Sequence, residues 1–244
     1  MPTIKKRVTN RRKHQPEEEI RSILHTVSEY ITEYKKLSII AAVVILTVVV
    51  ALSAYAVIQS SKDSKAAQLL PAAHELYSPT GGMQPDYQKA LERYQDIAKN
   101  YSGTMNGAVA QYYAGNCLAN LGRSEEALKE YRTFINEYSG KKFLLGLVNQ
   151  RMGLVYVSLG KQAEAVKAFG QAESLLGPGL STMELAKLYE RAGNPAESQK
   201  KYKEIAEKLP STMWAMEART KLPPPNLTAP PAPAATAAQG GVSK

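Results

Sequence analysis

The chain has 244 residues, a length that fits one domain with accessory segments. Its net charge of +9 is not focused, because residues 1–36 and residues 62–222 each carry +4, which argues against a nucleic-acid-binding surface. The single cysteine, Cys117, excludes a disulfide framework within the chain and is expected to pack as a small side chain in a helix.

The first 36 residues form a basic leader that ends in an amphipathic helical pattern. Residues 16–36 open with a proline and three glutamates, which are signals of a helix N-terminus. Apolar side chains then recur at helical spacing on one stripe, which comprises Ile20, Ile23, Leu24, Val27, Ile31 and Tyr34. Three roles stay open for this stripe: lying on the inner membrane surface, packing on a partner's membrane helix, or extending the anchor inward.

Residues 37–58 form an uncharged apolar segment of 22 residues. As a helix it would extend roughly 33 Å, and a hydrocarbon core is about 30 Å thick. Nine Lys or Arg residues precede it and only two, Lys62 and Lys65, follow closely, so the positive-inside rule predicts a cytoplasmic N-terminus. Ala54-Tyr55-Ala56 has the pattern of a signal cleavage site. The apolar run exceeds the about 7–15 residues of a signal peptide, however, which favours an uncleaved anchor and leaves cleavage open.

A twelve-residue phrase recurs along residues 62–222. ALERYQDIAKNY begins at Ala90, ALKEYRTFINEY begins at Ala127, and weaker copies begin at Ala165 and Ser198. A second helical stretch and a glycine precede each of the last three copies. The anchor aromatic residues of the four copies are Tyr94, Tyr131, Phe169 and Tyr202. Self-similarity at a period of about 20–50 residues indicates a repeat protein.

These units resemble tetratricopeptide repeats, which are helix–turn–helix units of about 34 residues. The resemblance implies small residues where two helices cross, aromatic residues beside them, a glycine at the turn and a closing proline. The residues assigned to these structural positions are Gly115, Ala127, Gly153, Tyr156, Gly160, Ala165, Phe169, Tyr189, Tyr202 and Pro210. The first unit matches least well, because the glycines and prolines of residues 78–86 indicate a loop that interrupts its leading helix.

The expected fold is all-α, with a single N-terminal transmembrane helix followed by an α-solenoid of about four tetratricopeptide-like helix pairs. An unrelated antiparallel helical bundle is the alternative. Residues 223–244 contain six prolines, a composition that predicts a disordered extension with polyproline character. The predicted segments are therefore the leader (1–36), the transmembrane helix (37–58), the repeat domain (62–222) and the Pro/Ala-rich tail (223–244).

The sequence offers few groups for catalysis. Two of its three histidines, His14 and His25, lie in the leader, and His74 has no spaced second histidine with which to bind a metal. No glycine-rich phosphate-binding loop occurs. We therefore expect no enzyme activity, no cofactor and no metal.

The leading helices of such arrays line a concave groove that holds a partner segment. Amides and cations in that groove suit a peptide backbone or a carboxylate, and an ordinary solvated face is the alternative. The lysine/asparagine clamp of chaperone-binding repeats is not matched at its own positions, so that partner class is not implied. The side chains predicted to share the groove are Tyr112, Asn116, Asn120, Gln150, Leu154, Lys187 and Arg191.

The layout of basic leader, single span and repeat array resembles the ancillary subunit family of the bacterial SecYEG translocon. That resemblance implies a single-pass protein of the inner membrane, with periplasmic repeats that hand exported chains to periplasmic chaperones. Residues 209–222 also look like the repeats of cell-division coordinator and outer-membrane assembly families, and a module for those processes is the alternative. Those families are usually secreted or lipid-anchored, and this chain has no lipobox cysteine. An enzyme or sensor with a regulatory repeat arm is a third hypothesis, which the sparse titratable groups disfavour.

Overall fold

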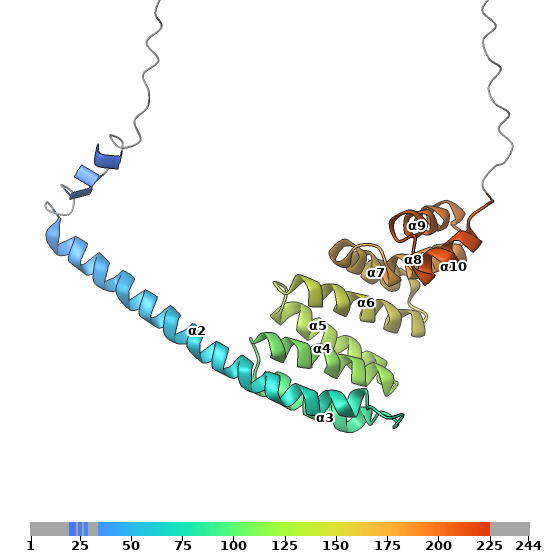
Figure 1. Cartoon of the computed structure of the whole chain (residues 1–244), viewed down its shortest axis with the longest axis horizontal. Helices are drawn as coiled ribbons and strands as arrows, with labels where there is room; N and C mark the ends of the chain where they lie inside the picture. Colours follow the sequence, from blue (N-terminus) through green and yellow to red (C-terminus); the bar gives the residue numbers. More distant parts are fainter. Residues whose placement is uncertain (1–19, 23, 26, 29–33, 225–244) are drawn as a thin grey trace, which may run out of the picture. The chain divides into compact units, whose positions relative to one another are not determined.

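The computed structural model describes residues 20–22, 24–25, 27–28 and 34–224 (Figure 1). Within these ranges every regular element is a helix and no strand occurs. The chain divides into two compact units, Met1–Ser61 and Lys62–Lys244. Residues 1–19 with the basic residues they contain, Ile23 and Ile31 of the apolar stripe, and the Pro/Ala-rich tail from residue 225 lie outside the described residues.

The first unit contains the beginning of helix α2 (Lys35–Tyr77). The predicted apolar segment lies entirely within this helix, and its large side chains are exposed, as are Ile20, Leu24 and Val27 of the leader stripe. A helix that is apolar on all sides is typical of apolar surroundings. Among the described helices, α2 is the one whose length and composition could cross a membrane, a test that an N-terminal signal sequence also passes.

The second unit holds the rest of α2 and eight further helices in its described part. They are α3 (Tyr87–Asn100), α4 (Met105–Asn120), α5 (Ser124–Glu137), α6 (Lys142–Ser158), α7 (Gln162–Leu176), α8 (Leu180–Arg191), α9 (Pro195–Lys208) and α10 (Met213–Lys221). From α3 onward each helix packs against the next, and α4 also contacts α6 (Figure 1). Contacts within a helix pair and between adjacent pairs are typical of a solenoid. The prediction of an all-α repeat fold is confirmed.

A loop at residues 78–86 joins α2 to α3. Within it, Glu75 Oε1 accepts hydrogen bonds from the backbone N–H and the hydroxyl of Thr80, both at 3.0 Å. The loop ends at Asp86, whose side chain caps α3 by accepting from the backbone N–H of Lys89 at 3.0 Å. The loop therefore follows the leading helix of the first pair and does not interrupt it. It replaces the short glycine turn of the later pairs.

The middle pairs are held by aromatic rings that lie against glycines. A Cβ atom added to Gly153 of α6 would lie 2.6 Å from Cε1 of Phe169 on α7. Gly115 of α4 faces the ring of Tyr131 on α5 in the same way. Both rings are fully buried. Since no other residue leaves room for these rings, the two glycines set the close approach of the paired helices.

The other residues assigned to repeat positions differ in burial. The turn residue Gly160 has φ 71°, a left-handed conformation that favours glycine. Tyr189 is half-buried and Pro210 is exposed. The buried members of the set are Ala127, Tyr156, Ala165 and Tyr202.

The apolar core of the repeat domain has two parts. The larger part runs through the helices from α2 to α7 and includes Leu185 and Leu188 of α8. The smaller part joins α8, α9 and α10 and consists of Met183, Ala186, Tyr202, Ile205, Ala215 and Ala218. The last helix pair and α10 therefore share a core of their own.

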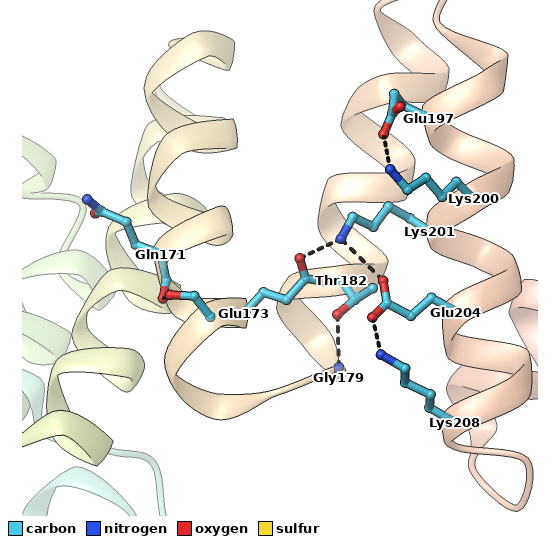
Figure 2. Close-up of polar contacts among 10 residues, drawn as sticks. Gln171, Glu173, Gly179, Thr182, Glu197, Lys200, Lys201, Glu204 and Lys208 are labelled. Carbon is cyan, nitrogen blue, oxygen red and sulfur yellow. Dashed lines mark hydrogen bonds and ion pairs between the residues drawn. The ribbon is translucent and has the colours of Figure 1, made fainter.

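A set of ion pairs spans the junction between these two parts (Figure 2). Lys201 Nζ of α9 lies 2.5 Å from Oε2 of Glu173 on α7 and 3.3 Å from Oε2 of Glu204. The other oxygen of Glu204 accepts from Lys208 Nζ at 2.8 Å. The side chains of Lys201 and Glu173 are only 16% and 17% exposed, so this contact is screened less than a surface pair.

Candidate partner-binding groove

A pocket of about 260 Å³ opens between α4 and α6. We call it the α4–α6 pocket. Its lining residues come from α4, α5 and α6 and are Asn116, Ala119, Asn120, Ser124, Tyr131, Arg151, Leu154, Val155 and Ser158. The lining contains hydroxyl, amide and guanidinium groups but no carboxylate.

Asn116 lines this pocket and has a buried side-chain donor that is unused. Its side chain is 2% exposed, and its Oδ1 accepts a hydrogen bond of 2.7 Å from the hydroxyl of Tyr131. Its Nδ2 has no hydrogen-bond partner. Burial raises the pKa of Tyr131 above its ordinary value, so the hydroxyl keeps the proton that it donates. A buried donor without a partner costs about 1–3 kcal/mol, so Asn116 is a candidate ligand-binding group.

Arg151 supplies the only charge in the pocket lining. Its Nε donates to the hydroxyl of Tyr112 at 3.4 Å, which ties α6 to α4. Among the described residues it forms no ion pair within 4 Å, whereas Arg123 on the nearby α4–α5 turn is paired with Glu126 at 2.7 Å. The guanidinium is always protonated, so the pocket carries an uncompensated positive charge.

Aromatic side chains continue the groove from α4 toward the part of α2 in the second unit. The ring of Tyr113 lies 5.2 Å from Tyr77, 5.1 Å from Tyr94 and 5.1 Å from Tyr112, measured between ring centroids. The hydroxyl of Tyr77 also accepts from Nδ2 of Asn120 at 3.5 Å. The pocket therefore lies beside a cluster of aromatic rings, of which Tyr94 and Tyr112 are buried in the core and Tyr77 and Tyr113 are partly buried.

The structure brings together some of the groove residues that the sequence predicts. Asn116, Asn120 and Leu154 line the same pocket, and Tyr112 adjoins it through its contact with Arg151. Gln150 is half-buried and is not part of the lining.

The two predicted cations of α8 lie outside this pocket. Lys187 is already paired, because its Nζ lies 3.0 Å from Oε1 of Glu217 on α10 and 3.7 Å from Oε1 of Glu184. Arg191 Nε donates to the backbone carbonyl of Lys187 at 3.4 Å. The charge of Lys187 is thus partly compensated within the chain, which makes it a weaker candidate than Arg151 for an acidic partner.

Sequence reasoning missed Arg151, Tyr77 and Tyr113. Arg151 shares a helical face with Leu154 and Ser158, at spacings of three and seven residues, so helical periodicity from Leu154 could have found it. Tyr77 and Tyr113 carry no comparable signal, because their proximity depends on how α2 packs on α4.

The described residues give little sign of reactive chemistry. No three His, Cys, Asp or Glu side chains in this part of the chain converge on a position that could hold a metal. Cys117 is buried, and burial raises the pKa of its thiol to about 12. The thiolate is the nucleophile, so a protonated thiol is poorly reactive at neutral pH.

Comparison with known proteins agrees with this architecture. Residues 109–140, which span most of α4 and all of α5, match the family model described as tetratricopeptide repeat. No curated protein has a significantly similar sequence.

Solved structures align with this chain at low sequence identity. A tetratricopeptide repeat protein from Parabacteroides merdae aligns with a TM-score of 0.53 and 13% identity, over 65% of this chain and 59% of that one. YrrB, described as a TPR protein with an unusual peptide-binding site, aligns with a TM-score of 0.44 and 16% identity, over 55% of this chain and 66% of its own. This chain thus spans less than two thirds of either protein. A putative kinesin light chain from Podosopora anserina, with nearly identical TPR-like repeats, aligns with a TM-score of 0.47 and 15% identity, over 67% of this chain and 82% of that chain.

The family match falls on the helix pair that supplies Asn116 and Asn120, and the helix pairs on either side of it repeat the same fold. Residues 109–140 are therefore similar to a tetratricopeptide repeat, and the repeat domain shares the fold of a protein built from such repeats.

Proposed function

We propose that this protein is a membrane-anchored interaction scaffold whose α4–α6 pocket holds a segment of a partner protein. One observation carries this proposal: the buried amide of Asn116 has a donor without a partner, and it lines a pocket beside the uncompensated charge of Arg151. Both groups are poorly satisfied within the chain, and a bound polar segment would satisfy them.

Anchoring is supported by the exposed apolar surface of α2 over residues 37–58. The Lys and Arg bias around this segment supports a cytoplasmic N-terminus, with the repeats on the other side of a bacterial inner membrane. In this arrangement the pocket of the second unit meets extracytoplasmic partners.

The finer part of the proposal is association with the Sec translocon and transfer of exported chains to periplasmic chaperones. It is supported by the order of segments along the chain, with a basic leader, one apolar segment and a repeat domain. Co-purification from membranes in mild detergent tests it. Recovery of translocon subunits supports this assignment, and recovery of cell-division or outer-membrane assembly proteins in their place contradicts it.

Topology is tested by reporter fusions placed before Leu37 and after Lys65. We expect the first to report the cytoplasm and the second the extracytoplasmic side, and the protein to stay in the membrane pellet after alkaline carbonate extraction. If the protein is extracted as a soluble species, or if both reporters indicate the cytoplasm, the anchoring proposal is wrong.

Partner binding by the pocket is tested with a photo-crosslinking amino acid at Asn120, which lines the pocket and is exposed. Lys129, on the exposed surface of α5, is the matched control. We expect one defined protein to be crosslinked in cells from position 120 and not from position 129. Equal crosslinking from both positions would contradict a specific role for the groove.

A further inference from the structure

We infer that two copies of this chain associate end to end, with helix α10 of one copy lying in a groove between α2 and α3 of the other. The groove has a volume of about 430 Å³ and belongs to the second unit. We call it the α2–α3 groove. It shares no lining residue with the α4–α6 pocket. Its lining residues are Leu69, Ala72, Leu76, Arg93, Asp96, Ile97, Asn100 and Tyr101.

The first helix pair can be aligned with the second through two tyrosine hydroxyls. Tyr131 of α5 donates to Asn116 of α4. Tyr94 of α3 has the same place in the repeated phrase, and its hydroxyl lies 3.3 Å from Nδ1 of His74 on α2. His74 is therefore the equivalent of Asn116, 42 residues earlier (116 − 74). By the same separation, the three residues that α2 contributes to the groove correspond in α4 to Gln111, Ala114 and Leu118.

This face of the leading helix is covered inside the array and open at its first end. The three equivalent α4 residues are buried, and α3 packs against α4 there. In α2, by contrast, Leu69 is 46% exposed, Ala72 is exposed and Leu76 is half-buried. No helix in the described part of the chain takes the place that α3 has on α4. The positions of α6 that correspond to the α4 residues are buried as well, and they are Asn149, Met152 and Tyr156.

The chemistry of the groove suits an apolar helix. Terminal units of repeat arrays usually have a polar outer face, which keeps the array soluble. Here Leu69, Leu76 and Ile97 line the open end instead. The two ionised lining residues, Arg93 and Asp96, have opposite charges, so the groove has no net charge to attract an ion.

Helix α10 has a second exposed apolar face, at the other end of the series of helices (Figure 1). Met213 and Met216 are 83% and 66% exposed, and Trp214 is also exposed. The opposite side of α10, with Ala215 and Ala218, is buried against α8 and α9. No other described helix of the repeat domain exposes three large apolar side chains within four residues. Exposed apolar patches of this kind mark interaction sites.

The groove and α10 match in length and in chemistry. Leu69 and Leu76 are seven residues apart on α2, which is about 10 Å along a helix, and the nine residues of α10 extend roughly 14 Å. Methionine side chains adapt to irregular apolar gaps. Helix α10 of a second copy therefore fits where a preceding trailing helix would lie.

A contact between α10 and the groove covers both exposed apolar surfaces with one interface. It joins two different surfaces of the same chain, so it is heterologous and can add further copies. Pairing of two grooves would be isologous and would leave both α10 faces exposed to water. We therefore assign the groove to α10 of a second copy.

The test uses the full chain in detergent micelles and sedimentation equilibrium at increasing protein concentration. We expect the wild-type chain to form dimers and larger species. Leu69→Asp in the groove and Met216→Asp on α10 should each weaken association at least about tenfold, because the interface would bury an unpaired charge. Phe143→Asp is the matched control, since Phe143 is exposed and lies on neither surface, and it should associate as the wild type does. Thermal melts report whether each variant keeps its fold.

An equimolar mixture of the two variants distinguishes a heterologous contact from an isologous one. A Leu69→Asp copy keeps its α10, and a Met216→Asp copy keeps its groove. The mixture should therefore form a dimer and no larger species, although each variant alone stays monomeric. Unchanged association of a folded Met216→Asp protein, or no dimer in the mixture, would overturn the assignment of the groove to α10.

Disulfide crosslinking in native membranes tests the same contact without detergent. Copies with Leu69→Cys and copies with Met216→Cys, which have different affinity tags, are expressed together and oxidised with copper phenanthroline. Cys117 is buried, so it should contribute little. We expect a disulfide-linked dimer that contains both tags, and none when Phe143→Cys replaces Met216→Cys. Crosslinking only between two Leu69→Cys copies, or a wild-type chain that is monomeric at every concentration, would overturn the inference.

Discussion

The middle helix pairs, α4 to α7, and the terminal helices, α8 to α10, are stabilised in different ways. In the middle pairs, rings such as Phe169 pack directly on glycines and join one continuous apolar core. In the terminal helices the core is small, and exposed ion pairs accompany it, such as Lys221–Glu190 at 3.0 Å. Exposed ion pairs contribute about 0–1 kcal/mol each, whereas burial of an aromatic side chain contributes more. The middle pairs should therefore be the more stable part.

This difference matters for binding, because the α4–α6 pocket lies in the middle pairs. In a repeat array the free energy of unfolding is approximately a sum of the intrinsic stabilities of the units and the interaction energies between neighbouring units. The terminal helices lie at the end of that series. They are joined to it by Leu185 and Leu188 of α8, which belong to the larger core, and by the Glu173–Lys201 contact (Figure 2). The single tryptophan, Trp214, lies in α10. Its fluorescence reports on the terminal helices, while far-UV circular dichroism reports on all helices.

Phe169→Ala should have the largest effect. The ring is fully buried against Gly153, and truncation of a buried Phe costs about 3–5 kcal/mol because it leaves a cavity. In urea unfolding we expect the main circular dichroism transition to move to lower urea. Phe143→Ala is the control, because Phe143 is 67% exposed, and it should change the free energy of unfolding by no more than about 0.5 kcal/mol. Similar effects of the two variants would contradict the glycine–aromatic crossing.

Ala165→Leu should have the next largest effect. Ala165 is fully buried in α7, and overpacking such a position costs about 1–3 kcal/mol. Because neighbouring units are coupled, the circular dichroism and Trp214 transitions should both shift. Ala186→Leu, in the core of the terminal helices, should shift the Trp214 transition more than the circular dichroism transition. An unchanged midpoint for Ala165→Leu would mean that the repeat register is wrong.

The repeats were predictable because their signal is local, whereas most of the site was not. The phrase that begins at Ala90 and Ala127 repeats small and aromatic residues at fixed spacing, and the fold follows that spacing. Asn116 was predicted from its place on a helix face. Its Nδ2 is unpaired because the hydroxyl of Tyr131 on α5 donates to Oδ1 of the same amide, and helix periodicity does not reveal that contact. The pairing of Lys187 with Glu217 depends on α10, 30 residues later.

The sequence analysis also did not predict that the apolar helix is continuous with the leading helix of the first pair. The predicted apolar helix ends at residue 58, but α2 continues to Tyr77. Hydropathy detects where apolar residues stop. It does not detect where a helix stops, and the polar residues that follow are compatible with helix.

Glu173→Gln should have a smaller and more local effect. The change removes the charge that faces Lys201, but Lys201 keeps its contact with Glu204 at 3.3 Å. A loss of about 1 kcal/mol is therefore expected, seen in the Trp214 transition and not in the main circular dichroism transition. Lys203→Ala is the matched control, because its pair with Glu207, at 3.8 Å, is exposed at both ends. Its effect should stay within about 0.5 kcal/mol. A shift of both transitions by Glu173→Gln would show that the two parts unfold as one.

A change of pH near neutrality should have the smallest effect on stability. In strong acid and in alkali, the middle pairs and the terminal helices should lose stability to different extents. Burial raises the pKa of Cys117 from 9.0 to about 12 and also raises the pKa of Tyr94 and Tyr131. Above about pH 9 the unfolded chain therefore binds fewer protons than the folded chain, so stability falls as the pH rises. These three groups belong to the larger core, and alkali should lower the circular dichroism transition.

Acid should act most on the terminal helices, by the opposite change in protonation. Hydrogen bonds also lower the pKa of Glu125 and Glu126 on α5, but both carboxylates are exposed and therefore screened. A hydrogen bond from Lys208 lowers the pKa of Glu204 below its ordinary value of 4.5. The ionised carboxylate of Glu204 therefore stabilises the folded chain at pH values above its ordinary pKa of 4.5. This stabilisation is lost as the pH falls through the lowered pKa of the folded chain. Burial also raises the pKa of Tyr202 in α9, so the terminal helices should respond to alkali as well, but with fewer groups. Melts at pH 4, 7 and 10.5, followed by both signals, should therefore show the Trp214 transition falling first in acid and the circular dichroism transition falling most in alkali. Parallel shifts of both signals at both extremes would mean that the same contacts limit the stability of both parts.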